Sequence, residues 1–144
     1  MIIYPVAQIL LTCILSCIFS IHFYWFLGGE KGLDASLPHD INSIKKRLSN
    51  TSIRMLNALL IFPILLVLIT LIISIHSENS ILTPFQQQIH LYASILFILR
   101  GLFGWVLTRF SKKPDFKRNN TYIFSPLSLL IGFLFLSLIF FNSH

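Results

Sequence analysis

Long apolar runs alternate with short polar stretches along the chain, and the charged residues gather in the polar stretches. Residues 1–29 and 55–77 contain no Asp, Glu, Lys or Arg, and the run from 79 to 108 contains only Arg100. A helix needs about 20 apolar residues to cross a bilayer, so the pattern predicts four transmembrane helices in a single domain, 1–144. They are expected near residues 5–27, 54–76, 86–109 and 122–142, and their short connections favour an all-α antiparallel four-helix bundle.

The composition excludes a soluble globular protein and a disordered one. Hydrophobic residues make up 55% of the 144 residues and charged residues 11%, and the mean hydropathy is +0.78. A soluble domain carries about 25% charged residues, which is more than twice the share found here. So few charges cannot cover a water-exposed surface, and the expected surroundings of the chain are therefore the lipid bilayer.

The distribution of Lys and Arg predicts how the helices are oriented, because cytoplasmic loops of membrane proteins are enriched in these two residues. The first predicted loop, with Arg54 at its edge, contains five of them, the middle loop none and the third loop five. The first and third loops are therefore expected in the cytoplasm, with both termini and the middle loop outside. Within the first loop, residues 41–48 have the pattern of a short helix lying on the membrane surface, although a solvated basic loop fits equally well. The net charge of +6 follows from this distribution and gives no reason to expect a nucleic-acid partner.

The end of the first apolar run contains a motif of aromatic residues and glycines. Its spacing is His-x-Tyr-Trp-x-x-Gly-Gly-x-x-Gly followed by a proline, formed by His22, Tyr24, Trp25, Gly28, Gly29, Gly32 and Pro38. This segment resembles the signature of a family of small bacterial membrane proteins known as domain of unknown function 3995. The resemblance implies a multi-pass protein of the bacterial inner membrane and implies no particular activity.

Two further elements of that family have counterparts in this chain. Arg100-Gly101 resembles an intramembrane arginine followed by glycine, and residues 116–128 resemble the element Phe-x-x-x-Asp-Thr-x-x-Tyr-Ser-Pro-Leu-Cys. The chain departs from the last element at three positions, since Asn120, Phe124 and Ser128 stand where the family has aspartate, tyrosine and cysteine. A role that needs a carboxylate at 120 or a thiol at 128 is therefore not expected here.

Arg100 is a charged residue in a segment that is expected to cross the membrane. A charge in the bilayer core costs about 3 to more than 10 kcal/mol, depending on the method, so its side chain should face protein or water. Apart from Phe97, the residues that share its helix face are small or polar, namely Gln86, His90, Ala93, Gly104 and Thr108. All five carboxylates lie outside the predicted spans. Arg100 is therefore expected either to bond backbone carbonyls or to hold a phosphate or carboxylate from outside the chain.

Other polar residues are expected at the same depth as Arg100, in the cytoplasmic half of the bundle. They are His22, Asn57, Ser125 and Ser128, and Tyr24 and Trp25 are expected to wall the resulting pocket. Some of these residues also have ordinary explanations. His22 fits a hydrogen-bonded core position, and Tyr24 and Trp25 fit aromatic anchors at the membrane interface.

Two pairs of residues raise the question of redox or metal chemistry. Cys13 and Cys17 lie four residues apart, without the Cys-x-x-Cys spacing of thiol oxidoreductases, which favours a packing role. His76 and His90 flank the middle loop and could ligate a metal or haem, but no further ligand accompanies them, which favours two interfacial histidines. No catalytic residue, metal site or cofactor is therefore predicted.

Together these observations predict a binding or accessory protein rather than an enzyme. The pocket around Arg100 and His22 would hold an anionic lipid headgroup or another anionic amphiphile. One alternative is a scaffold subunit whose Arg100 pairs with a carboxylate of a partner membrane protein. The other is a membrane-embedded enzyme that carries out group transfer or redox chemistry.

Overall fold

The computed structural model of the chain describes residues 3–38, 50–76 and 83–142. All regular structure in these residues is helical, so the prediction of an all-α protein is confirmed. The long helices are α1 (Ile3–Phe26), α4 (Asn50–His76), α5 (Thr83–Phe110) and α7 (Ser125–Asn142). The short ones are α2 (Leu33–Ser36), α6 (Pro114–Asn119) and the π-helix η1 (Asn120–Phe124). Residues 41–48, for which a surface helix and a solvated loop fit the sequence equally well, lie outside the described residues.

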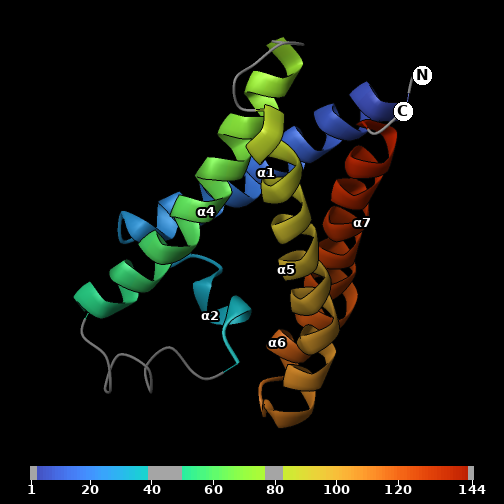
Figure 1. Ribbon diagram of the computed structural model, residues 1–144. Coiled ribbons are helices and arrows are strands. Elements are labelled where there is room, and N and C mark those ends of the chain that lie inside the picture. Colours follow the sequence, from blue (N-terminus) through green and yellow to red (C-terminus); the bar gives the residue numbers. More distant parts are fainter. Residues whose placement is uncertain (1–2, 39–49, 77–82, 143–144) are drawn as a thin grey trace.

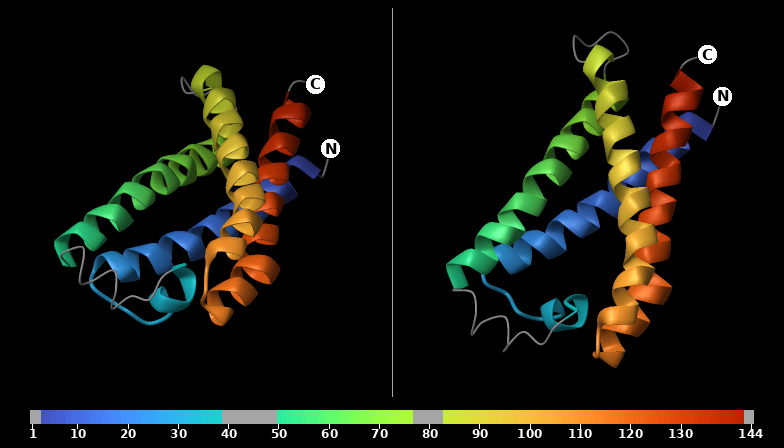
Figure 2. Two further views of the ribbon diagram at one scale, coloured as in Figure 1. Left: turned by 90° about the horizontal axis from the view of Figure 1, so that it is seen from below. Right: turned by 60° about the horizontal axis from the view of Figure 1, so that its bottom comes forward.

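The long helices are arranged as two antiparallel pairs, α1 with α4 and α5 with α7 (Figure 1). The two pairs meet at the end of the molecule where α1 begins and α7 ends, and they diverge toward the other end (Figure 2). The short helices α2 and α6 lie at this diverging end and contact each other. The pairs are thus in contact through their long helices at one end and through short segments at the other.

The core lies where the two helix pairs meet. Leu11 and Leu15 of α1, Leu71 of α4 and Phe135 of α7 are fully buried there. Phe97 of α5 stacks on Phe135, with the ring centroids 6.3 Å apart. Lipid chains are as apolar as leucine, so helices in a membrane are held together by close packing more than by the hydrophobic effect.

Glycines allow α5 and α7 to approach each other closely. A β-carbon on Gly101 would lie 2.6 Å from Leu129 Cγ, and one on Gly132 would lie 2.6 Å from Ile98 Cγ1. Ser94 Oγ of α5 is buried and donates a hydrogen bond of 2.9 Å to the Gly132 carbonyl of α7. Small residues and interhelical hydrogen bonds of this kind are typical of helix contacts in membranes.

Three described segments are long and apolar enough to cross a membrane, namely Pro5–Phe26, Phe85–Phe110 and Pro114–Phe140. The described apolar part of α4 is shorter, at Ala58–Ser74. The chain is therefore a membrane protein, as its composition predicts. The last segment begins before residue 122, where the final transmembrane helix is expected, because α6, η1 and α7 follow one another without a break.

Candidate functional site

The aromatic–glycine motif forms a turn that ends α1. Gly28 has a φ of 102°, in the left-handed region that favours glycine. The Tyr24 ring lies against Gly29, where a β-carbon would collide with it, and the Gly29 N–H donates to the Tyr24 carbonyl at 3.0 Å. Trp25 Nε1 donates to the Lys31 carbonyl at 3.0 Å. In the described contacts, Tyr24 and Trp25 therefore stabilise the turn.

The turn leads into α2, which lies against the segment between α5 and α6. Gly32, with a φ of 79°, directly precedes α2. Lys113 Nζ forms an ion pair of 2.6 Å with Asp34 Oδ1 and also donates to the Asp34 carbonyl at 2.7 Å. Ser111 Oγ donates to the Pro38 carbonyl at 2.8 Å. This contact, called the Asp34–Lys113 latch below, connects the loop after α1 with the loop after α5.

The Arg100 side chain of α5 lies against η1. Its Nη2 donates a hydrogen bond of 3.2 Å to Asn120 Oδ1, and Asn120 Nδ2 donates to the Gly104 carbonyl. Asn120 is fully buried, whereas Arg100 is exposed. The Asn120 amide is thus fixed to α5 at its nitrogen and presents its oxygen to the guanidinium. A guanidinium has five N–H donors, so Arg100 retains donors for a further partner.

Gly104 and Ser125 complete this arrangement. A β-carbon on Gly104 would lie 2.8 Å from Arg100 Nη1 and 3.2 Å from Asn120 Nδ2, and it would collide with Ser125 Oγ. A side chain at position 104 would therefore displace the guanidinium. Ser125 is fully buried, and its Oγ has no hydrogen-bond partner within the described part of the chain. Arg100, Gly104, Asn120 and Ser125 are called the Arg100 site below.

The π-helix η1 sets the position of Asn120. The Ser125 N–H donates to the Asn120 carbonyl five residues earlier, and this wider turn separates the α-helical segments α6 and α7. Trp105 Nε1 of α5 donates to the Thr121 carbonyl at 3.3 Å. Such π-turns within α-helices are frequent at functional sites. The coincidence of η1 with the Arg100 contact therefore marks this region as the candidate site.

Within the described residues, no carboxylate neutralises Arg100. Asp34 pairs with Lys113, and Asp115 pairs with Arg118 at 3.6 Å on α6. The hydrogen bond that Arg100 makes goes to the neutral amide of Asn120. Within the described part of the chain, the positive charge of Arg100 is therefore not paired with a carboxylate.

The remaining residues of the predicted pocket have other surroundings. Ser128 of α7 is buried and donates to the Phe124 carbonyl at 2.7 Å. His22 of α1 makes an edge-to-face contact with Trp25, with ring centroids 5.1 Å apart. Asn57 belongs to α4, but its side chain lies outside the described residues. The structure thus brings Arg100 and Ser125 together, and a contact of His22 or Asn57 with Arg100 stays a prediction.

Two residues of the Arg100 site, Asn120 and Gly104, are not among the site residues predicted from the sequence. Gly104 follows Arg100 by four residues and therefore lies on the next turn of the same helix face. That spacing could have indicated room for the guanidinium. No pattern in the sequence indicates that a π-helix turns Asn120 toward α5.

A second group of buried polar residues lies where the helix pairs meet. Gln86 Nε2 of α5 donates to the Thr70 carbonyl of α4 at 2.8 Å, and Gln8 Nε2 of α1 donates to Ser74 Oγ of α4 at 2.6 Å. His90 of α5 is also buried, rather than exposed at the membrane interface. Among the described residues, no group of three His, Cys, Asp or Glu is placed to hold a metal ion. These polar contacts therefore connect α4 with α1 and α5, and they form no metal centre within the described residues.

Comparison with known proteins identifies the family of the chain. A family model described as a protein of unknown function (DUF3995) matches residues 15–135. Neither a curated protein nor a solved structure matches the chain. The matched range includes the turn after α1, the Asp34–Lys113 latch and the whole Arg100 site. The chain therefore belongs to the DUF3995 family of proteins of unknown function.

Proposed function

We propose that the protein binds an anionic amphiphile, such as an anionic lipid, with the Arg100 site as the headgroup site. The observation that carries this proposal is the state of the guanidinium: it is exposed, and its described hydrogen bond goes to a neutral amide. The planar guanidinium presents paired donors that match the oxygens of a phosphate or carboxylate. An anion would therefore supply the charge partner that the described residues do not supply.

The proposal includes a definite placement in the bacterial inner membrane. The four long helices form an antiparallel bundle that crosses the membrane four times, with both termini outside, because Lys and Arg are confined to the first and third loops apart from Arg100. Helix α4 has 27 residues, which at about 1.5 Å per residue exceeds the roughly 30 Å of the hydrocarbon core. Arg100 then lies about 13 Å, or nine residues, from Arg109 at the cytoplasmic boundary.

This depth suits a lipid headgroup. An arginine side chain can extend several ångströms toward the membrane surface while its stem stays in the apolar region. In the proposal, His22 of α1 and Asn57 of α4 contribute to the same pocket from the other helix pair, Ser128 lies beside it, and Tyr24 and Trp25 border it. Retaining an uncompensated charge in the membrane is costly, and a bound anion would offset much of that cost.

The proposal is tested by measuring which lipids the purified protein retains. The protein is exchanged into detergent with equal amounts of phosphatidylglycerol and phosphatidylcholine of the same chain length, and the bound lipids are counted by native mass spectrometry. The wild type is expected to prefer phosphatidylglycerol. Arg100→Gln should abolish this preference, because glutamine keeps hydrogen-bonding capacity but carries no charge.

Arg109→Gln is the matched control, since it removes an exposed arginine from the same helix. This variant should keep the preference for phosphatidylglycerol. An unchanged preference in Arg100→Gln would contradict the proposal. The proposal would also be contradicted if a second membrane protein bound the wild type stoichiometrically and did not bind Arg100→Gln. Arg100 would then pair with a carboxylate of that partner.

A further inference from the structure

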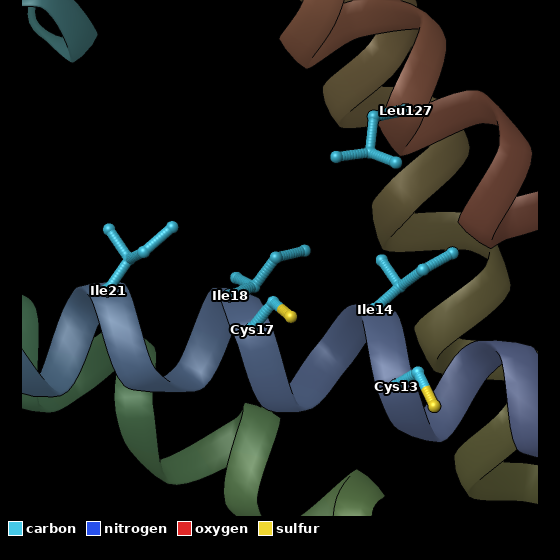
Figure 3. Close-up of a pocket in the computed structure, with 6 residues that line it drawn as sticks. All are labelled: Cys13, Ile14, Cys17, Ile18, Ile21 and Leu127. Carbon is cyan, nitrogen blue, oxygen red and sulfur yellow. The ribbon is translucent and has the colours of Figure 1, made fainter.

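An apolar groove lies between α1 and α7 (Figure 3). It has a volume of about 340 Å³ and is lined by Cys13, Ile14, Cys17, Ile18, Ile21 and Leu127. None of these side chains is charged, and the thiols are their only polar groups. The groove follows α1 from Cys13 to Ile21, which corresponds to about 12 Å at 1.5 Å per residue.

The groove arises from the way in which α1 is packed. Leu11 and Leu15 are fully buried in the core, whereas Cys13 and Cys17 are exposed. Ile21 is 50% exposed. Since the helix pairs diverge toward the end of α1 (Figure 2), this strip of the helix is left open beside α7.

The groove and the Arg100 site share helix α7. Leu127, which forms its wall on α7, follows Ser125 of the Arg100 site by two residues. Phe97 lies one turn from Arg100 on the same face of α5, and both Phe97 and Leu127 pack against the core cluster. The apolar wall at Leu127 and the Arg100 site therefore lie within about one helix turn of each other along α7, a separation that a single amphiphile can span.

We propose that this groove holds one acyl chain of the lipid whose anionic headgroup binds at Arg100. The inference rests on the proposed function and specifies its ligand as a long-chain anionic lipid rather than a free anion. Arg100 supplies the charge complementarity, and the groove supplies a path for the chain from the same site.

The lining of the groove favours a lipid chain over a transmembrane helix. The contact between α5 and α7 depends on Gly101, Gly104 and Gly132, whose missing β-carbons allow the two backbones to approach. Helix partners in membranes generally need such small residues. Apart from Cys13 and Cys17, the groove is lined by larger side chains. Among them, the β-branched Ile14, Ile18 and Ile21 on α1 hold a second backbone away while leaving space for a thin chain.

Photochemical cross-linking tests this placement on the intact protein. The wild type is reconstituted into phosphatidylcholine nanodiscs with a small fraction of phosphatidylglycerol that carries a diazirine in one acyl chain. Cross-links are mapped by mass spectrometry and compared with those at Ile9 and Ser16, which are exposed on α1 but do not line the groove. We expect groove residues to be labelled about tenfold more, as one charge-assisted hydrogen bond at Arg100 would produce.

Two substitutions separate the groove from the headgroup site. Cys17→Trp fills the groove and should remove the enriched labelling, whereas Ser16→Trp, the matched control, should preserve it. Arg100→Gln should also remove the enrichment, because the chain is no longer held by its headgroup. Both tryptophans replace exposed residues, so neither substitution disturbs the core.

The possible failures are distinguishable. Uniform labelling on all sides of α1 would overturn the groove inference. If the preference for phosphatidylglycerol still depended on Arg100, the proposed function would remain supported. No preference for phosphatidylglycerol would overturn both. Efficient oxidative cross-linking of Cys17 to Cys17 between two copies would show that a second copy covers the groove, and it would overturn the inference as well.

Discussion

Replacing Asn120 with aspartate should inactivate the Arg100 site without unfolding the protein. The two side chains have nearly the same shape, so a carboxylate oxygen can take the place of Asn120 Oδ1 beside Arg100 Nη2. The change supplies Arg100 with an internal counter-charge. An external anion would then meet a neutral pair instead of a free cation.

The estimated interaction energies predict that the Asn120→Asp variant still folds. At the Nη2–Oδ1 distance of 3.2 Å, opposite unit charges attract by about 5 kcal/mol with an effective dielectric constant of 20. Against this, aspartate cannot donate to the Gly104 carbonyl, which costs about 1–3 kcal/mol for a buried acceptor left unpaired. Burying the carboxylate costs several further kcal/mol, so the net change in the free energy of unfolding should be small.

The effect on lipid affinity should be larger than the effect on stability. A charge-assisted hydrogen bond contributes about 1.5–3 kcal/mol, and losing it should weaken phosphatidylglycerol binding about 10- to 150-fold. Binding is measured by native mass spectrometry over a range of lipid concentrations, and folding by circular dichroism. Asn119→Asp is the matched control, because it introduces the same charge one residue away. Wild-type affinity in Asn120→Asp, or equal weakening in the control, would refute the reasoning.

Three further predictions concern stability, the latch and topology. Gly104→Leu should lower the free energy of unfolding by about 1–3 kcal/mol, because the new side chain collides with Ser125 Oγ; unchanged stability in denaturation would contradict the contact. Lys113→Ala should speed hydrogen exchange in α2 at a cost of less than about 1 kcal/mol, since the Asp34 partner is half exposed, while Lys112→Ala should not alter exchange. In a background with both native cysteines replaced by alanine, which should still fold, cysteines at positions 49, 80 and 112 are labelled with an impermeant thiol reagent in sealed cells. Labelling is expected at 80 alone, and reaction at 49 or 112 would contradict the orientation.

The helical elements could be predicted because the apolar runs are long and clearly separated by charge. The boundaries were less accurate, since a helix can extend beyond its apolar part. Helix α4 begins at Asn50, before the predicted start at 54, because the polar segment Asn50-Thr51-Ser52 continues the same helix. The divergence of the helix pairs could not be predicted, because hydropathy indicates which segments are apolar and not which of them touch.

The candidate site was predicted in part. Arg100 was identified because a charged residue within an apolar run is costly and is therefore expected to have a function or a partner. Ser125 was identified because its expected depth in the membrane matches that of Arg100. The π-helix could not be foreseen, since its wider turn is supported by contacts with α5, such as that of Trp105 with the Thr121 carbonyl. That Tyr24 borders the pocket stays a prediction. The contact of its ring with Gly29 could not be foreseen, because it depends on the backbone path of the turn.

The most direct test of headgroup binding at Arg100 is an experimental structure of the wild type in nanodiscs that contain phosphatidylglycerol. The expected result is phosphate density within about 3 Å of an Arg100 guanidinium nitrogen, continuous with chain density in the groove beside Cys17. The contradictory result is an Arg100 whose donors are all taken by Asn120, backbone carbonyls or the carboxylate of another protein chain, with no lipid phosphate in contact.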